Sequence, residues 1–381
     1  MIALLTVLAA CDKDETPTPS NNSAPPPPPP PPDSTARCDN SQRARVNAQL
    51  IPIARLPEKR LGFAVAAVGG KILFAGGFNE DGNLGFTRVD IYDVGRNTWS
   101  TAELSAGRGG MAAVTAGNKV FFAGGFVYNW DTYYYKTFDT VDIYDAENNT
   151  WAVARLSGPR GSLAAATVGN KVLFAGGSIE LDNITSATVD IYDLSTDSWS
   201  TALLSEAKSD LIAVTLNNKI YFAGGHKPYG SSAFEATNRI EIYDHTTNSW
   251  STDTLKRPMG YLAGIAAADQ IYWAENCSVE IKNVQAGTSS EAFLYRSVQG
   301  GELVGLKALM KNNKIIFFRP HPDGATNTFD IYDLATQTWS IGTLPMKVYG
   351  AYIFSVDDTI YLAGGMIYNT YPTDQVWKLE F

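Results

Sequence analysis

The feature that most constrains the fold of this 381-residue chain is an internal repeat. Five near-copies of the pattern Val-Asp-Ile-Tyr-Asp are each followed by a short polar turn and a tryptophan seven residues after the tyrosine. The five pairs are Tyr92 and Trp99, Tyr144 and Trp151, Tyr192 and Trp199, Tyr243 and Trp250, and Tyr332 and Trp339. Because one repeated unit accounts for the length, we expect a single closed domain and not several separate ones.

A second repeated element lies upstream of the tyrosine in each of the first four repeats and occurs again near the end of the chain. It is a short apolar run, rich in β-branched and aromatic residues, that ends in a glycine pair. The pairs are Gly76–Gly77, Gly124–Gly125, Gly176–Gly177, Gly224–Gly225 and Gly364–Gly365. Short runs of this composition between polar turns predict strands, and the sequence shows no helical period. We therefore predict an all-β fold.

The glycine pair followed by spaced tyrosine and tryptophan resembles the kelch repeat, and the resemblance covers essentially the whole chain after residue 45. It implies a β-propeller of four-stranded antiparallel blades, and each repeat supplies four strand-like segments. Small residues in the first segment, such as 63–68, suit the crowded propeller axis. The glycines, tyrosines and tryptophans are then expected to be structural, since they allow close backbone approach and pack blade on blade.

The two ends of the repeat region predict how the ring closes. Ile51 lies 20 residues before Lys71, the spacing that separates each tryptophan from a following strand, so Ile51 is expected at a tryptophan position. Its strand would complete the last blade beside the strand that ends at Phe381, giving seven blades and no exposed sheet edge. Blades five and six lack the glycine pair, through drift or specialisation, so six blades are the alternative.

The first 44 residues differ in composition from the repeats. Residues 1–10 are uniformly apolar and predict a signal peptide, and Cys11 follows them as in a bacterial lipobox. The alternatives are a start further upstream or a cysteine placed by chance. Residues 11–44 are then expected to form a lipidated tether with a stiff proline tract, Pro25–Pro32, and residues 45–381 the propeller. Residues 12–15 resemble the acidic, lysine-containing tag of bacterial surface lipoproteins, which favours an anchor in the outer membrane or at the cell surface.

Length variation predicts which face of the propeller carries function. The second glycine of each pair precedes the tyrosine by 15, 19, 15 and 18 residues in the first four blades, so the loops between the second and third strands vary. Variable loops on a rigid scaffold usually hold binding residues. We call the face on which these loops emerge the loop face. Its predicted ligand-binding residues are Tyr128, Trp130, Tyr133, Tyr134, His226, Tyr229 and Tyr368. The alternative role for the aromatic residues is to cover the loop of a neighbouring blade.

Four cations fall nine residues after a tryptophan position, at the start of the innermost strand. They are Arg60, Arg108, Arg160 and Lys208. A ring of cations around the channel mouth would bind a carboxylate or sulfate through charge-assisted hydrogen bonds, and we include the four among the candidate ligand-binding residues. Arginine at this point also resembles the ordinary kelch pattern, so a structural ion pair with a loop carboxylate is the other interpretation.

Composition narrows the class of partner. The formal charge of −9 leaves no basic excess for phosphates, so we expect no nucleic acid, and contact with a membrane only through the anchor. We predict a monomeric module, without cofactor or metal, that binds a glycan or a protein. Position argues against a disulfide between Cys38 and Cys277, because they are expected on opposite sides of the propeller.

The kelch resemblance suggests two enzymatic hypotheses. A mutarotase or epimerase for an acidic sugar such as sialic acid would use the cations as a clamp, with Asp131, Glu180 or Glu235 as the acid–base residue. A copper radical oxidase would need a histidine cluster and a cysteine–tyrosine crosslink. His226, His245 and His321 are scattered, and no local motif of that enzyme is present, so we do not expect copper.

Overall fold

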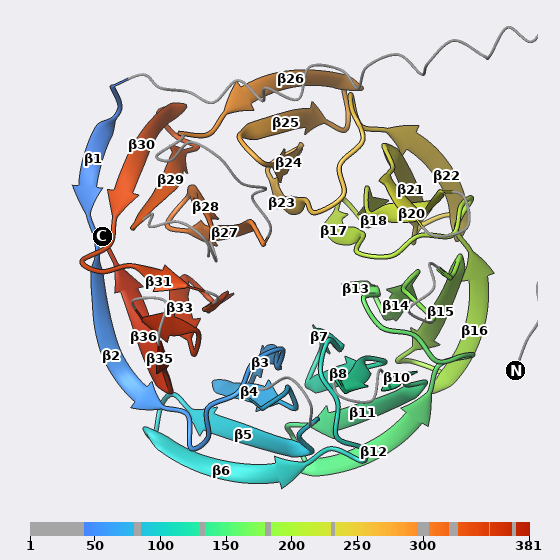
Figure 1. Ribbon diagram of the computed structural model, residues 1–381. Coiled ribbons are helices and arrows are strands. Elements are labelled where there is room, and N and C mark those ends of the chain that lie inside the picture. Colours follow the sequence, from blue (N-terminus) through green and yellow to red (C-terminus); the bar gives the residue numbers. More distant parts are fainter. Residues whose placement is uncertain are drawn as a thin grey trace, which may run out of the picture. The chain divides into compact units, whose positions relative to one another are not determined.

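Each repeat folds into one antiparallel blade, and seven blades stand in a ring around a central channel (Figure 1). The computed structural model describes residues 42–79, 85–129, 134–179, 184–229, 233–295, 305–319, 327–349, 351–367 and 371–381. All of the regular structure in these ranges is β. The prediction of an all-β propeller with seven blades is confirmed, and six blades are excluded. Within the same ranges no helix could span a bilayer.

The first three blades are regular and differ only in their loops. From the channel outward they contain β3 (Ala64–Val68), β4 (Lys71–Ala75), β5 (Arg88–Asp93) and β6 (Thr98–Glu103); β7 (Ala112–Ala116), β8 (Lys119–Ala123), β11 (Thr140–Asp145) and β12 (Thr150–Arg155); and β13 (Ala164–Val168), β14 (Lys171–Ala175), β15 (Thr188–Asp193) and β16 (Ser198–Leu203). In blade two the loop between the second and third strands forms an extra hairpin, β9 (Phe126–Asn129) with β10 (Tyr134–Thr137).

Blades four to six keep the same order. They contain β17 (Ile212–Leu216), β18 (Lys219–Ala223), β21 (Arg239–Asp244) and β22 (Ser249–Thr254); β23 (Ala263–Ala267), β24 (Gln270–Glu275), β25 (Ser278–Asn283) and β26 (Thr288–Phe293); and β27 (Lys307–Lys311), β28 (Lys314–Phe318), β29 (Thr328–Asp333) and β30 (Thr338–Thr343). Blade four carries a second loop hairpin, β19 (His226–Tyr229) with β20 (Ala233–Ala236). In blade five only a two-residue turn joins the second and third strands.

Blade seven is built from both ends of the chain. It contains β32 (Tyr352–Val356), β33 (Thr359–Ala363), β36 (Gln375–Glu380) and, outermost, the N-terminal β2 (Gln49–Arg55). A small separate sheet contains β31 (Val348–Tyr349), which precedes β32, and β34 (Met366–Ile367) and β35 (Tyr371–Pro372), which lie between β33 and β36 in the sequence. Because β2 pairs antiparallel with β36, the predicted closure by backbone hydrogen bonds is confirmed.

The predicted position of Ile51 within this strand is wrong by one residue. In blade one Trp99 pairs with Tyr92. The residue equivalent to Tyr92 in blade seven is Leu379, and it pairs with Leu50. Ile51 is 39% exposed. The cause is a β-bulge between Pro52 and Ala54, which adds one residue to the spacing from which the position was counted.

The tyrosines and tryptophans have the structural role that was expected. In five blades the two rings of a pair lie with centroids 4.7 to 5.2 Å apart. The Tyr92 hydroxyl donates a hydrogen bond of 2.8 Å to Asn97, whose left-handed backbone (φ 54°) makes the turn before the tryptophan. Leu73 of blade one also packs in one cluster with Phe122 of blade two, so the core lies between blades.

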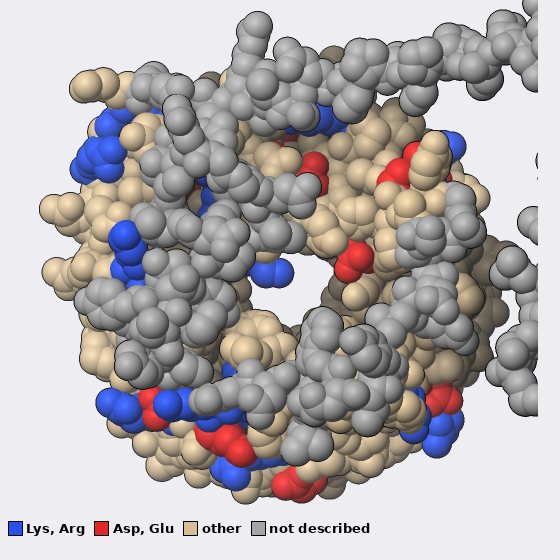
Figure 2. Space-filling view, viewed as in Figure 1, with Lys and Arg blue, Asp and Glu red and all other residues tan. Residues whose placement is uncertain are grey.

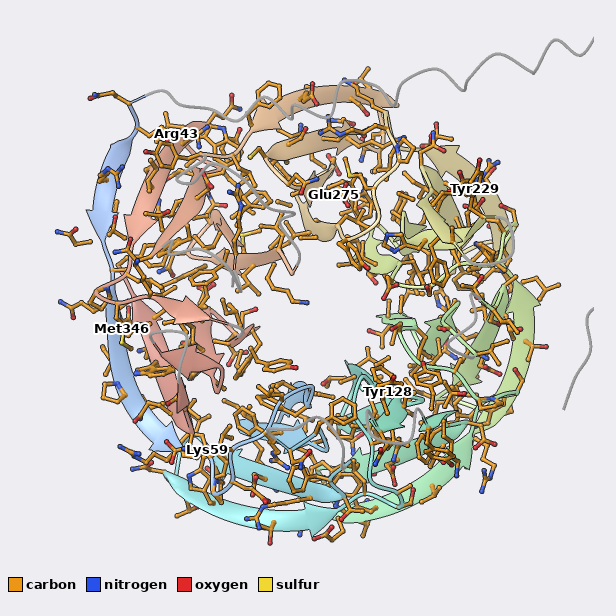
Figure 3. All side chains as sticks on the ribbon, viewed as in Figure 1. Arg43, Lys59, Tyr128, Tyr229, Glu275 and Met346 are labelled. Atoms are coloured by element: carbon orange, nitrogen blue, oxygen red, sulfur yellow. The ribbon has the colours of Figure 1, made fainter. Side chains whose placement is uncertain are left out.

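The N-terminal segment contacts three blades. β1 (Ala44–Asn47) runs parallel to the outer strand of blade six before β2 enters blade seven. Arg43 lies just ahead of it (Figure 3), and its guanidinium donates to Asp330 of blade six (Nη1 to Oδ1, 2.8 Å) and to the Phe293 carbonyl of blade five (Nη2, 2.6 Å). The segment therefore ties blades five, six and seven together.

One of the three cysteines, Cys277, lies near the blade-five end of the N-terminal segment's contacts. Cys277 is disulfide-bonded, and the two other cysteines, Cys11 and Cys38, lie outside the described residues. The partner of Cys277 lies outside the described residues, so the expectation that Cys277 does not pair with Cys38 stays a prediction. Arg43 of the N-terminal segment donates to the Phe293 carbonyl. The amide of the next residue, Leu294, donates to the Cys277 carbonyl at 2.7 Å.

We predict that Arg43→Ala lowers the free energy of unfolding by about 3 kcal/mol, because it leaves the Asp330 carboxylate buried without its closest cation. Arg45, two residues further on in β1, donates to the Tyr295 hydroxyl in an exposed position, so Arg45→Ala should cost less than about 1 kcal/mol. Urea unfolding followed by tryptophan fluorescence measures both values. Equal stability of the two variants would contradict the stabilising role of the Arg43–Asp330 ion pair.

Candidate functional site on the loop face

The four predicted cations are buried. Arg60, Arg108, Arg160 and Lys208 are at most 2% exposed, so they do not form an open ring at the channel mouth. For the three arginines the acidic partner is on the third strand of the same blade and not in a loop as expected, whereas Lys208 Nζ lies 3.9 Å from Glu206 Oε1 in the connection between blades three and four. Arg60 pairs with Asp90, Arg108 with Asp142 and Arg160 with Asp190, while Lys208 lies near Glu241. Of the two interpretations, these contacts fit the structural one.

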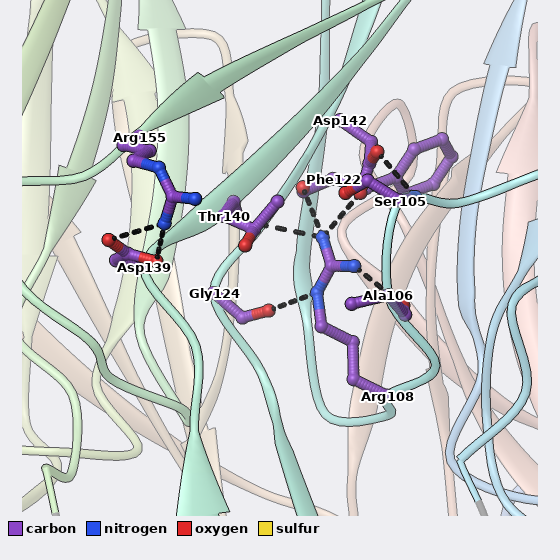
Figure 4. A network of polar contacts seen from close by, with 9 residues as sticks. All are labelled: Ser105, Ala106, Arg108, Phe122, Gly124, Asp139, Thr140, Asp142 and Arg155. Atoms are coloured by element: carbon purple, nitrogen blue, oxygen red, sulfur yellow. Dashed lines mark hydrogen bonds and ion pairs between the residues drawn. The ribbon is translucent and has the colours of Figure 1, made fainter.

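Blade two shows how one such pair joins neighbouring blades (Figure 4). Arg108 Nη2 lies 2.7 Å from Asp142 Oδ2, and its Nε donates to the Gly124 carbonyl at 2.8 Å. The other oxygen of Asp142 accepts the amide N–H of Ser105 at 2.9 Å. Ser105 belongs to the connection that leaves blade one, so the carboxylate ties that connection to blade two.

The pattern varies in the later blades. Burial lowers the pKa of Lys208 to about 8, and the carboxylates of Glu241 and Glu206 only partly oppose this effect. Blade five has Met259 where the cation stands elsewhere, and its Glu280 accepts the Lys256 amide and the Ser289 hydroxyl. In blade six Arg43 supplies the cation.

Blade seven has neither member of the pair. Val348 stands at the cation position and Trp377 at the acid position, and both are buried. The cation and the carboxylate are thus lost together, as expected when an isolated buried charge would be costly.

The aromatic residues of the blade-two hairpin divide into two groups. Tyr135 packs against Phe126 (5.5 Å between ring centroids) and near Tyr128 (6.3 Å), within the hairpin. Tyr134 instead is 54% exposed. The hairpin also reaches blade three, where the Thr137 hydroxyl donates to the Ile179 carbonyl at 2.8 Å. One hairpin therefore contains both a packed aromatic ring, Tyr135, and an exposed one, Tyr134. Trp130, Tyr133 and Tyr368 lie outside the described residues.

A second group of side chains meets between blades four and five. His226 begins β19, and its Nδ1 lies 3.5 Å from Asp210 Oδ2. The imidazole packs on the ring of Tyr261 with centroids 4.4 Å apart, and on Phe234 at 6.4 Å. Tyr229, Phe234 and Tyr261 are 62%, 42% and 47% exposed. We call Asp210, His226 and Tyr261 the blade four–five cluster.

Sequence reasoning missed Tyr261 and Asp210. Both occupy the position two residues after the cation site, which is Gly62 in blade one and Gly110 in blade two. A comparison of this position between repeats would have shown that blades four and five place side chains where blades one and two have none. That comparison is the signal that could have found them.

Glu275 explains the departure of blade five from the repeat. In blades one to four, the residue after the cation site pairs through its backbone with the residue after the glycine pair, as Ser209 does with His226. Blade five has no such loop residue. The Glu275 carboxylate takes its place and accepts the N–H groups of Gly260 and Tyr261, each at 2.7 Å. Figure 3 places Glu275 nearer the channel than Tyr229. The departure is therefore consistent with a local specialisation.

The blade-two hairpin and the blade four–five cluster lie along one path of contacts. Burial raises the pKa of Tyr135. A hydrogen bond with Ser178 of blade three opposes this rise, and the negative charge of Asp210 in blade four adds to it. Asp210 in turn contacts His226, and His226 contacts Tyr261 of blade five. The path therefore crosses blades two to five.

Charged groups of both signs are interspersed on the face seen in Figure 2. Glu235, one predicted acid–base residue, is 3.1 Å from Lys227, and Asp131 and Glu180 lie outside the described ranges. His245 packs on Gly169 in a turn far from His226 in the blade, and His321 is not described. Among the residues that are described, no three His, Cys, Asp or Glu side chains are arranged to hold a metal ion.

Comparison with known proteins agrees with this architecture. The kelch motif matches residues 59–103 and 159–202, which contain blades one and three. The structure titled "Structure of YjhT" has a TM-score of 0.52 and 14% sequence identity, over 85% of this chain and 96% of that one, which shows a shared fold. No curated protein matches the sequence. The chain is a kelch-repeat β-propeller.

We predict that Arg108→Ala lowers the free energy of unfolding by about 3 kcal/mol, because Asp142 would stay buried without a cation. The matched control is Arg155→Ala in the same blade. Arg155 makes two hydrogen bonds to Asp139 (Figure 4), but its side chain is 69% exposed, so the loss should be below about 1 kcal/mol. Thermal and urea unfolding measure both. A small loss for Arg108→Ala would contradict a structural pair.

We also predict that Glu275→Ala costs about 1–3 kcal/mol, since two backbone N–H groups would lose their acceptor. Glu275→Gln keeps a carbonyl oxygen and should retain most of the stability. The exposed Glu235→Ala serves as control, with an expected change below about 0.5 kcal/mol. Unfolding midpoints in urea give the order, and Glu275→Ala equal to the control would refute this role.

Proposed function

We propose that this propeller is a binding module whose loop face, over blades two to five, receives a glycan or protein ligand. The observation that carries the proposal is the set of exposed aromatic side chains on that face. Tyr134, Tyr229, Phe234 and Tyr261 are each 42% or more exposed. Rigid aromatic residues of this kind are enriched among residues that dominate binding energy. Their backbone is fixed by hairpins and by Glu275, which lowers the entropy lost on binding.

The enzymatic alternative loses the feature on which it was based. A mutarotase for an acidic sugar was inferred from a cationic clamp of Arg60, Arg108, Arg160 and Lys208. All four are buried and hold acidic or backbone partners within the protein. Binding without chemical conversion is therefore the function that we favour.

The cellular location of this module and its membrane anchor are also proposals. The apolar residues 1–10, Cys11 and the proline tract support an exported protein that is lipid-anchored to the bacterial outer membrane. In this arrangement the anchor tethers a monomeric propeller, and the proline tract acts as a spacer. Cys11 would carry the lipid.

The test is a glycan array and a peptide array probed with the purified chain. We expect binding that Tyr134→Ala or Tyr229→Ala weakens roughly tenfold, since both remove an exposed aromatic contact. Leu203→Ala is the control, because Leu203 is 71% exposed but lies on the outer strand of blade three, and it should leave binding unchanged. Binding insensitive to both tyrosines would contradict the proposal. Mutarotation of free sialic acid, detected by NMR and abolished by Arg108→Ala in a folded protein, would favour the enzyme.

A further inference from the structure

We propose that the blade four–five cluster is a subsite for the ring of a neutral sugar, which rests on the glycan binding proposed above and specifies its ligand. Three side chains from two blades converge there. His226 lies between Asp210, with Nδ1 3.5 Å from Oδ2, and the ring of Tyr261, with centroids 4.4 Å apart. The Tyr261 side chain is the most exposed of the three, and the imidazole is the least exposed.

The cluster retains a carboxylate at a position where the backbone favours glycine. Asp210 has φ 56°, and the same position holds Gly62 (φ 65°) and Gly110 (φ 61°) in blades one and two and Ser162 (φ 51°) in blade three. The inter-blade contact is preserved, because the Asp210 amide donates to the Ser162 carbonyl at 3.0 Å as Gly110 does to Gly62 at 3.1 Å. Glycine would satisfy the fold here without strain, so the fold itself does not require the Asp210 carboxylate.

Tyr261 is held in place from two sides. The Glu275 carboxylate accepts its N–H at 2.7 Å. The imidazole of His226 lies so close to Gly260 that a Cβ on this glycine would collide with it. A preorganised aromatic platform loses little conformational freedom when a ligand stacks on it.

The chemistry of the cluster matches a polyhydroxylated ring. Asp210 is an acceptor with two oxygens, while the imidazole and the phenol can each donate and accept. Sugar hydroxyls also do both, so a ring whose apolar face stacks on Tyr261 could bond to Asp210 and His226 at the same time. A cation would bind more tightly where several aromatic faces surround it. Here the imidazole of His226 already covers part of the Tyr261 ring.

The charges around the cluster favour a neutral ligand over an acidic one. The Asp210 side chain is 35% exposed and would repel a carboxylate. The nearby cations are engaged, since Lys208 is fully buried and Lys227 lies 3.1 Å from Glu235. A sugar without a carboxylate meets no such repulsion.

The experiment titrates the full chain with single sugars and reads saturation-transfer NMR and calorimetry. The neutral probes are the methyl glycosides of glucose, galactose, mannose and N-acetylglucosamine. The acidic probes are glucuronate and N-acetylneuraminate, and N-acetyl-lysine amide represents a basic peptide. The variants are Tyr261→Ala, Tyr261→Phe and Asp210→Asn, with Leu203→Ala as control and circular dichroism to confirm folding.

We expect at least one neutral glycoside to bind more tightly than either acidic sugar. Tyr261→Ala should weaken it by roughly tenfold, and Tyr261→Phe should retain most of the affinity because the ring remains. Asp210→Asn should weaken it several-fold, which tests the site even if Tyr261→Ala fails to fold, and Leu203→Ala should have no effect.

Three results would overturn the subsite: absence of neutral-sugar binding, tighter binding of an acidic sugar, or neutral-sugar binding that survives both Tyr261→Ala and Asp210→Asn. Binding of N-acetyl-lysine amide alone, lost in Tyr261→Ala, would also overturn it in favour of a basic peptide. The wider proposal is separable, because array binding that depends on Tyr134 and Tyr229 but not on Tyr261 would uphold the loop face and refute only the sugar subsite.

Discussion

The buried carboxylate on the third strand of blades one to six is the contact on which the ring depends. In blade two, Asp142 receives Arg108 from its own blade and the amide of Ser105 from the connection that leaves blade one. One carboxylate therefore fixes the start of the innermost strand and the junction between two blades. Such a group is stable in the interior only when its partners are complete, because an isolated buried charge costs several kcal/mol. This requirement explains why blade seven replaces both partners by the apolar Val348 and Trp377.

The same requirement links the N-terminal segment to ring closure. Blade six keeps the acid, Asp330, and its closest cation is Arg43 from the segment that then forms β1 and β2. Arg319 of the same blade also lies nearby, at 3.7 Å. Closure therefore combines an ion pair to blade six with backbone pairing to β36 of blade seven. Interactions of two kinds, in neighbouring blades, stabilise the point at which a ring made from one chain would open most easily.

The sequence predicted the strands, the seven blades, the closing strand and the face with variable loops, because these depend on regular spacing. It could not predict details that break the spacing. The bulge between Pro52 and Ala54 shifts Leu50 into the place expected for Ile51, and Pro52 could not reveal it because proline occurs at edge strands as well as at bulges. The depth of Arg108 was also hidden, since its partner Asp142 lies 34 residues away and its position gives no measure of burial. Likewise the path that brings residues near Arg43 to Phe293 depends on tertiary structure alone.

The departures from the repeat carry the most information about function. A repeat unit that obeys every rule is explained by packing, so a site must be built from exceptions. Asp210 holds a left-handed backbone without being glycine, which costs on the order of 1 kcal/mol, and Glu275 replaces a glycine of the pair. Glu275 also restores the hydrogen bonds that the missing loop would have made, and so keeps Tyr261 beside His226. Ser162 makes the same backbone exception in blade three, so the backbone alone does not single out this junction. What the junction of blades four and five adds is a carboxylate, an imidazole and an exposed phenol that meet there, and this meeting of polar and aromatic groups is the pattern expected of a binding surface.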